Sequence, residues 1–241
     1  CKNCQLEIIY DVKMPATGSL ILANEFGNAD VGSLQGNTDF TIAYGNLDLD
    51  ELNGKNNIIR LKFGDAEASF LKAADVNVEY GNLEVGKAAY INLYSRFSGL
   101  ELGEVSELVI DSQYDGLELT SVEKVDGKAA FTGIEIGEVS DKMVLVSSYG
   151  EIEVDRVAVG FSLIDISTEF GGLELGIGSS ASYKLSASTS FGEINFPEKN
   201  ADITKQVEKS FEKEIEAFVG ADKSSASVVR LKAKNCDIDI D

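Results

Sequence analysis

Nine carboxylate side chains recur along this chain in one repeated setting, and they are the residues best suited to chemistry. Each stands between two aliphatic residues, as Glu101 stands between Leu100 and Leu102. Because side chains alternate between the two faces of a β-strand, an acid between two inward aliphatic residues points to solvent. The nine acids are Asp30, Asp48, Glu67, Glu84, Glu101, Glu118, Glu135, Glu153 and Glu174.

This row of acids has two interpretations. Carboxylate oxygens are ligands for Ca²⁺ and attract cationic partners, so the row could be a binding stripe. It could instead be a hydrated face that keeps the protein soluble. Stacked coils would place neighbouring acids about 4.8 Å apart, where like charges repel by about 1 kcal/mol per pair even in water. No basic column runs alongside. We expect the hydrated face, with weak or no Ca²⁺ binding and no bound cofactor.

The three cysteines, Cys1, Cys4 and Cys236, lie near the ends of the chain and leave three alternatives open. The Cys-x-x-Cys spacing at the start is a metal or redox motif, but a second ligand pair is missing. A disulfide from Cys1 or Cys4 to Cys236 requires that the two ends meet. A chain that begins at cysteine also fits the product of lipoprotein signal peptidase, with a lipid anchor on Cys1.

The charge balance limits the classes of partner. The 41 acidic and 21 basic residues give a formal charge of −20, which repels phosphate backbones and anionic lipids. We therefore expect no nucleic-acid partner, and metal cations or basic surfaces as counter-ions. The chain has no run of about 18 apolar residues, so no segment is expected to span a membrane. A hydrophobic fraction of 44% is enough for a sizeable core.

A repeated hexapeptide determines the expected fold. It reads YGNLEV at 80–85, FSGLEL at 97–102 and YDGLEL at 114–119, with an aromatic residue first and the acid fifth. Spacings of 17 to 21 residues separate the aromatic positions, which are Phe26, Tyr44, Phe63, Tyr80, Phe97, Tyr114, Phe131, Tyr149, Phe170 and Phe191. Such internal periodicity is the signature of a solenoid.

Apolar residues keep step with the aromatic position. They lie six and four residues before it, as Ile91 and Leu93 do before Phe97, and then three and five residues after it. The change from even to odd spacing implies that the backbone turns a corner after the aromatic position. Glycines such as Gly45 would there supply a positive φ angle or tolerate a crowded backbone. Two or three short strands per repeat then send apolar side chains to one interior. An antiparallel sandwich is the alternative, since its strands recur at similar spacing.

We therefore predict an all-β, single-stranded parallel β-helix of about ten coils of 17 to 21 residues, right-handed rather than left-handed. The prolines Pro15 and Pro197 bracket the repeats, since proline would interrupt strand pairing inside them. Residues 1–18 are expected to be an N-terminal cap, 19–196 the repeat array, and 197–241 a C-terminal cap with a last degenerate coil, NCDIDI at 235–240. The pattern within 202–218 fits a helix or a strand.

The aromatic column also has two interpretations. A row of exposed rings could form a strip on which carbohydrate stacks. The aromatic residues lie an even number of positions after inward-facing residues, and on an extended strand this places the rings inside. Six exposed Phe would also form an apolar patch that soluble proteins avoid. We therefore expect the aromatic residues to stack within the core.

The hexapeptide coils and the tail FVGADKSSASVV at 218–229 resemble the bacterial adhesin family that includes autotransporter-adhesin head GIN domains and related β-helix domains of unknown function. The resemblance covers nearly the whole chain and is weakest at the N-terminus. It implies a single-stranded β-helix that is exported to the periplasm or cell surface of a Gram-negative bacterium. It carries over no catalytic residue.

Three functions are compatible with these features of the sequence. We expect a non-catalytic adhesin or interaction surface of the cell envelope, whose partner is a protein or glycan surface. The alternatives are a pectinase-like, polysaccharide-active β-helix enzyme and a periplasmic structural rod. Histidine, the commonest proton-transfer residue near neutral pH, is absent. The arginines are spread through the chain without a local cluster, at Arg60, Arg96, Arg156 and Arg230. We therefore predict that the protein is not an enzyme.

Overall fold

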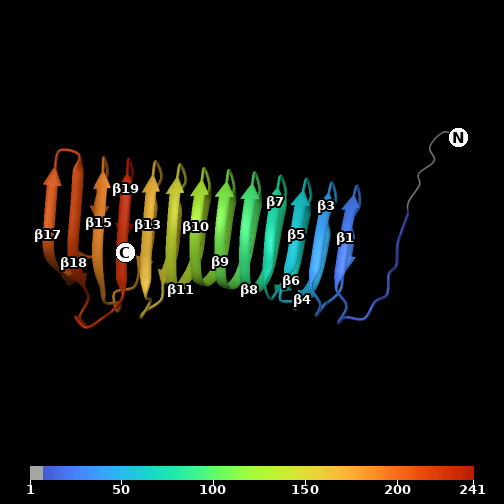
Figure 1. Ribbon diagram of the computed structural model, residues 1–241. Helices are drawn as coiled ribbons and strands as arrows, with labels where there is room; N and C mark the ends of the chain where they lie inside the picture. Colours follow the sequence, from blue (N-terminus) through green and yellow to red (C-terminus); the bar gives the residue numbers. More distant parts are fainter. Residues whose placement is uncertain (1–7) are drawn as a thin grey trace.

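The computed structural model describes residues 8–241, and it confirms the predicted parallel β-helix. Strands of successive coils pair side by side, so that about nine turns stack into one elongated solenoid (Figure 1). One 20-stranded sheet contains every strand of the described chain.

Each coil has one strand that leads up to the aromatic position and one that follows it. The leading strands are β1 (Leu20–Glu25), β3 (Thr38–Ala43), β5 (Asn57–Lys62), β7 (Ala74–Glu79), β13 (Leu163–Glu169) and β15 (Tyr183–Ser190). The following strands are β2 (Ala29–Val31), β4 (Leu47–Leu52), β6 (Asp65–Leu71), β12 (Ile152–Val157), β14 (Leu173–Ile177) and β16 (Ile194–Asn195).

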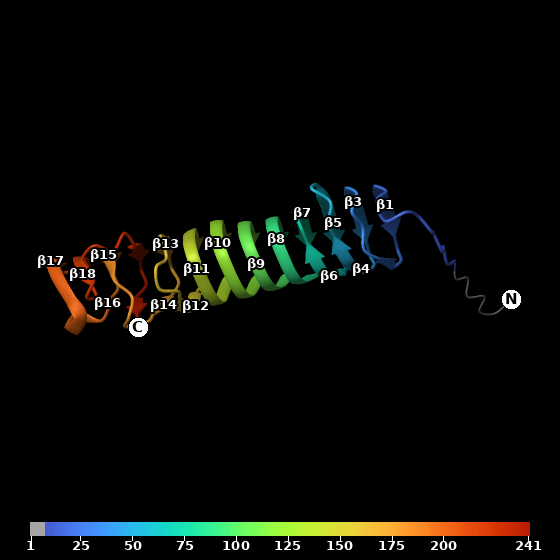
Figure 2. The same ribbon diagram turned by 90° about the horizontal axis from the view of Figure 1, so that it is seen from below.

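In the middle of the solenoid the following strand runs on without a break into the leading strand of the next coil. Figure 2 shows these long strands curving from one side of the solenoid to the other. They are β8 (Asn82–Arg96), β9 (Gly99–Gln113), β10 (Gly116–Ala130) and β11 (Gly133–Ser148).

The register joins equivalent residues of neighbouring coils. Leu83 pairs with Leu100, which pairs in turn with Leu117. The inward aliphatic columns identified in the sequence are buried and form a single core that runs the length of the array. One coil cannot cover its own apolar face, so this burial exists only because the coils stack.

The prediction that the aromatic residues lie in the core is wrong. All ten have φ angles of 53° to 62°, and the rings from Phe26 to Phe170 point outward with 40% to 74% of their surface exposed. The side-chain alternation used to place them inside holds only for extended backbone. A left-handed residue breaks that alternation and turns its own side chain outward at the corner.

The rings nonetheless form one stack, but on the surface. Nine rings from Phe26 to Phe170 lie with centroids 4.7 to 5.1 Å apart and planes within 13° of parallel. Phe and Tyr alternate strictly along these nine positions. A left-handed backbone conformation costs a non-glycine residue about 1–2 kcal/mol of free energy. Each stacked aromatic pair stabilises the fold by about 0.5–1.5 kcal/mol beyond its area burial. The stack thus offsets much of the strain of the corner.

The corner glycines have a different role from the positive φ angle that the sequence suggested. The aromatic residue carries the left-handed conformation, and Gly45 after it does not. A Cβ atom at Gly45 would lie 1.9 Å from the carbonyl oxygen of Gly27 in the preceding coil. Glycine is therefore required because two coils approach each other closely at this corner.

In three central coils the residue directly after the aromatic position is polar and the glycine comes second, the reverse of the usual order. The polar residues of these coils form a buried network. Asp115 is 9% exposed, and its carboxylate accepts hydrogen bonds from the hydroxyls of Ser95 (2.7 Å) and Ser112 (2.5 Å) and from the backbone N–H of Ser98 (2.7 Å). These bonds supply the partners that a buried carboxylate needs. The exchanged pairs are Ser98–Gly99, Asp115–Gly116 and Thr132–Gly133.

The strands of the C-terminal segment do not stack in the order in which they occur in the chain. After η1 (Glu198–Asn200), strands β17 (Ala201–Lys209) and β18 (Glu212–Val219) form an antiparallel hairpin, so residues 202–218 are strand and not helix. The hairpin pairs with β15. The chain then returns, and β19 (Val228–Lys234) inserts between β13 and β15, while β20 (Ile238–Ile240) pairs with β14 and β16.

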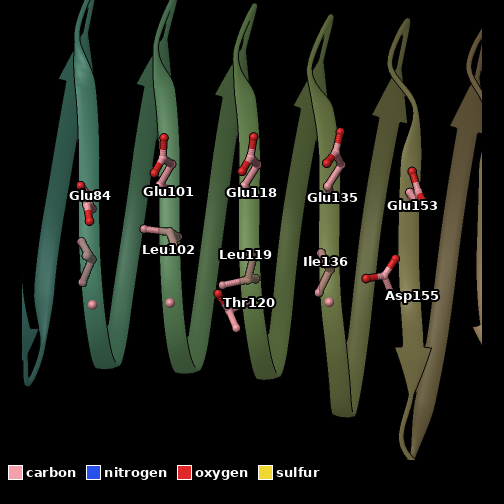
Figure 3. A pocket seen from close by; sticks show the side chains of 14 residues that line it. Glu84, Glu101, Leu102, Glu118, Leu119, Thr120, Glu135, Ile136, Glu153 and Asp155 are labelled. Carbon is pink, nitrogen blue, oxygen red and sulfur yellow. The ribbon is translucent and has the colours of Figure 1, made fainter.

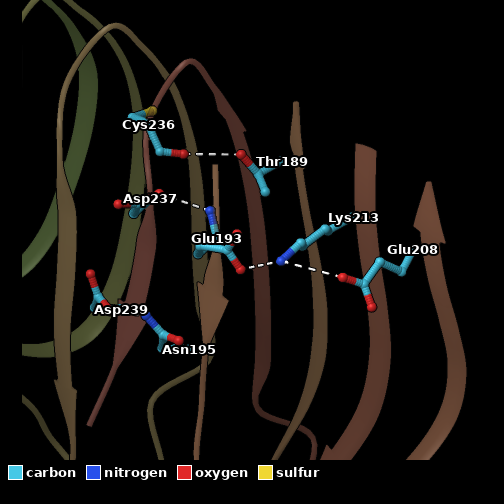
Figure 4. Close-up of polar contacts among 8 residues, drawn as sticks. All are labelled: Thr189, Glu193, Asn195, Glu208, Lys213, Cys236, Asp237 and Asp239. Atoms are coloured by element: carbon cyan, nitrogen blue, oxygen red, sulfur yellow. Dashed lines mark hydrogen bonds and ion pairs between the residues drawn. The ribbon is translucent and has the colours of Figure 1, made fainter. Parts of the chain in front are cut away.

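Side-chain contacts fix the inserted coil against its neighbour (Figure 4). The Thr189 hydroxyl donates to the carbonyl of Cys236 at 3.0 Å, and the backbone N–H of Glu193 donates to Asp237 at 2.8 Å. Lys213 of the hairpin forms an ion pair with Glu193. The degenerate coil therefore lies within the solenoid, and the hairpin lies at its end (Figure 1).

Candidate interaction surface

The nine predicted acids lie in register and point outward, as the sequence indicated. Each is exposed, and each pairs directly with the next along the array, as Glu101 does with Glu84 and Glu118. The inserted coil adds a tenth member, Asp239, beside Glu174. We call these ten residues the acidic ladder. Asn195 ends it by donating its side-chain amide to Asp239 at 2.6 Å.

Sequence reasoning missed Asp239 as a member of the ladder. The signal was present in the degenerate hexapeptide NCDIDI, where Asp239 occupies the acid position. What the sequence did not indicate was that this hexapeptide inserts beside the coil of Glu174.

A groove of about 390 Å³ runs along the ladder over the middle coils (Figure 3). Its sides include the ladder acids from Glu84 to Glu153 and also Asp155. Small residues form the neighbouring outward column, two positions further along each strand, at Gly86, Gly103, Thr120 and Gly137. A Cβ atom at Gly103 would lie 2.1 Å from the carbonyl oxygen of Gly86, so the close stacking of coils keeps the groove free of side chains there. No basic or aromatic residue lines it.

The ladder carboxylates are not neutralised by bases of the described chain. None of the ion pairs among residues 8–241 involves a ladder acid. The nearby pairs lie three residues further along the same strands, where Lys87 contacts Glu104 at 2.8 Å and Arg156 contacts Glu138. The ladder thus presents a line of uncompensated negative charge to the solvent.

Glu153 shows the effect of this crowding most clearly. Loss of hydration beside its neighbours, followed by the charges of Glu174, Asp155 and Glu135, raises the pKa of its carboxyl above the ordinary value of 4.5. The folded state therefore binds this proton more tightly than the unfolded chain does. Its contribution to stability is present below the unfolded pKa and is lost as the pH rises through the higher folded pKa.

We expect Glu153→Gln to raise the melting temperature at about pH 7.5, with the difference shrinking toward about pH 4. The amide keeps the size of the side chain and removes the repelled charge. Thermal melts across this pH range check the result. Glu198→Gln, at an acid outside the ladder, is the control and should show no such pH dependence. The quantity to compare is the melting temperature of the variant minus that of the wild type. If this difference is smaller at pH 7.5 than at pH 4, the raised pKa assigned to Glu153 is contradicted.

Calcium is the cation whose preferred ligands, carboxylate oxygens, this row presents. Within residues 8–241, no cluster of three or more His, Cys, Asp or Glu side chains has the geometry to hold a metal ion. In melts at pH 7.5, we expect NaCl to raise the melting temperature by screening and CaCl₂ at equal ionic strength to add little more. A large rise at low Ca²⁺ concentration would instead show a saturable site.

The aromatic stack forms a second surface feature. Its ring faces cover one another, so a sugar ring has no free face along the row on which to stack. The edges of the rings and the Tyr hydroxyls are what the stack presents to solvent. Lys62 lies 5.6 Å from the centroid of Phe63, and Lys234 lies 6.0 Å from that of Phe170. The row can therefore make edge contacts and not face-to-face stacking with a ligand.

The remaining residues singled out in the sequence do not converge on one site. Arg60 pairs with Asp39 at 2.6 Å, and Arg230 lies 3.5 Å from Asp165. Arg96 lies over the ring of Tyr94, on the outside of the solenoid. The thiol of Cys236 is buried and forms no disulfide within residues 8–241. Cys1 and Cys4 fall outside the described residues, so the lipid anchor and the disulfide stay predictions.

No family model matches this chain, and neither a curated protein nor a solved structure is significantly similar to it. Among the described residues, no helix is long and apolar enough to cross a membrane. The resemblance to the bacterial adhesin family therefore stays a prediction, and the β-solenoid fold is what the structure establishes.

Proposed function

We propose that this protein is a non-catalytic, exported β-solenoid of the Gram-negative cell envelope that acts as an adhesin-like interaction surface. The observation that carries the proposal is the acidic ladder, ten carboxylates in register with no ion-pair partner in residues 8–241. A surface built this way favours an extended partner that bears positive charge at regular intervals, on a protein or a glycan.

The energetics favour contact at many points. A single exposed ion pair contributes only about 0.2–1 kcal/mol. Contacts along a rigid row add up without a new entropic cost for each, because the first contact holds the partner near the others. Complementary charge also accelerates association and makes it sensitive to salt.

The residues along the groove also favour binding over catalysis. Its lining consists of acids, aliphatic residues, glycines and Thr120, with no lysine or arginine to act as a base beside the carboxylates. The continuous parallel pairing of β8 to β11, with one register shift after Val122, is equally compatible with a structural rod, the second candidate. A rod would not depend on the charge of the ladder.

The test is binding of the purified protein to an array of glycans and matrix proteins. The double variant Glu118→Gln with Glu135→Gln removes two charges from the middle of the groove. We expect it to weaken binding to any captured ligand about 10-fold, with wild-type affinity falling as salt rises. Glu107→Gln with Asp126→Asn removes equal charge outside the ladder and is the matched control. Equal loss in both variants would show that the ladder is not the binding face, and the absence of any ligand would favour the rod.

A further inference from the structure

Two positions fill the corner beside each aromatic residue. The first lies two residues before the aromatic residue, and the second lies directly after it. In three coils the second position is glycine and the first is a buried aliphatic residue, at Ile42, Leu61 and Val78. In three other coils the first position is small and the second carries a buried side chain, in the pairs Ser95–Ser98, Ser112–Asp115 and Ala129–Thr132. In these coils a side chain at one position compensates for a small residue at the other.

The coil of Tyr149 lacks this compensation. Its two positions are Ser147 and Gly150. In every other described coil, the two positions together carry more side chain than a single serine. Protein interiors are packed so closely that few voids exceed the size of a water molecule, so a corner short of about one atom has room for a water.

Two buried hydroxyls at this corner have no hydrogen-bond partner among residues 8–241. They belong to Ser147, which is 3% exposed, and to Thr168, which is 4% exposed. The two residues pair directly across neighbouring coils. By contrast, the Thr189 hydroxyl of the same column donates to the carbonyl of Cys236 at 3.0 Å. An unpaired buried hydroxyl destabilises the folded state, so this pair requires a partner.

A backbone carbonyl at the corner provides a third polar group. In a central coil, the hydroxyl of Ser98 donates to the carbonyl of Arg96, just before the aromatic residue, at 2.8 Å. In the coil that contains Thr168, the equivalent carbonyl belongs to Glu169, and Gly171 has no side chain to donate to it. A carbonyl oxygen has two lone pairs, and that of Glu169 accepts one bond from the backbone of the preceding coil at 2.8 Å.

We propose that one water molecule binds at this corner and bridges the hydroxyls of Ser147 and Thr168. It accepts from one hydroxyl and donates to the other and to the carbonyl of Glu169. Neighbouring strands lie about 4.8 Å apart, and two O–H···O bonds of about 2.8 Å through one oxygen can span that separation. Three hydrogen bonds are typical of a buried water. The water takes the role that the Ser98 hydroxyl has in its own coil, and this inference does not depend on the proposed function.

Crystal structures of the wild type and of two variants of equal shape test the site. We expect density for a water within about 3.2 Å of both hydroxyl oxygens in the wild type. Thr168→Val keeps the size of the side chain and removes one of the partners, so the water should be lost. Thr189→Val makes the same change at a hydroxyl that is already bonded to the protein, and it should leave the water in place. Melting curves report that both variants remain folded.

The wild-type structure alone can overturn the proposal, if the corner is dry or if the two hydroxyls bond directly to protein groups. A water that persists in Thr168→Val would also overturn it, by showing that other groups hold the water. Loss of the water in both variants would do the same, because the loss would then reflect a general change in the core and not the removal of the Thr168 hydroxyl.

Discussion

Replacing Leu100 with Asp is expected to destabilise the protein by about 3–5 kcal/mol, because it removes a buried aliphatic contact and places an unpaired charge in the core. Leu100 is 1% exposed and lies between Leu83 and Leu117 of the adjacent coils. The interior offers no base near this position, so the new carboxylate must be protonated or the coil must open.

The adjacent residue supplies the matched control. Glu101→Ala alters a side chain on the opposite face, between Glu84 and Glu118. We expect it to be neutral or slightly stabilising, since it relieves repulsion within the acidic ladder. Chemical denaturation followed by circular dichroism measures both variants. Similar destabilisation by the two substitutions would mean that the assigned inward and outward faces are wrong.

Removing residues 226–241 is expected to have the largest effect of any change considered. This segment carries β19 and β20, and its loss exposes the facing edges of β13 and β15. Four aliphatic side chains leave the core with it, Val229, Leu231, Ile238 and Ile240. At about 1.5–3 kcal/mol for each buried side chain, the loss is roughly 6 kcal/mol or more. We expect a fall in melting temperature of more than about 10 °C.

The position of the removed strand permits a rescue experiment. A synthetic peptide of residues 226–241 should insert between β13 and β15 and restore much of the lost stability, since the gap offers two unpaired strand edges. The same peptide with Leu231→Asp is the control and should not restore it. A truncated protein as stable as the full chain would show that β15 closes directly onto β13 and that the inserted coil contributes little.

The repeat in the sequence determined the coils and most of the candidate surface. The regular return of Leu83, Leu100 and Leu117 at one phase permits burial of all three only if successive coils stack in register. The same argument places Glu84, Glu101 and Glu118 outside, because an extended strand alternates its side chains. Core and ladder could therefore be predicted from local pattern alone.

The tertiary structure decided where the aromatic residues lie. A left-handed φ angle at Tyr80 or Phe97 is unfavourable for an isolated chain, so local pattern argues against it. The compensating stack forms between residues 17 or more positions apart and exists only once the coils are assembled. Counting side-chain alternation through that residue therefore gave the wrong face.

The tertiary structure also decided the order of the last coils. The hexapeptide NCDIDI indicates a coil, but its composition is compatible with any neighbour in the array. The hairpin of β17 and β18 pairs with β15 and covers the end of the solenoid, so the returning chain pairs between β13 and β15. Pairing between strands distant in sequence depends on which edges are free in three dimensions, and the sequence does not contain that information locally. This is why Asp239 joins the acidic ladder beside Glu174.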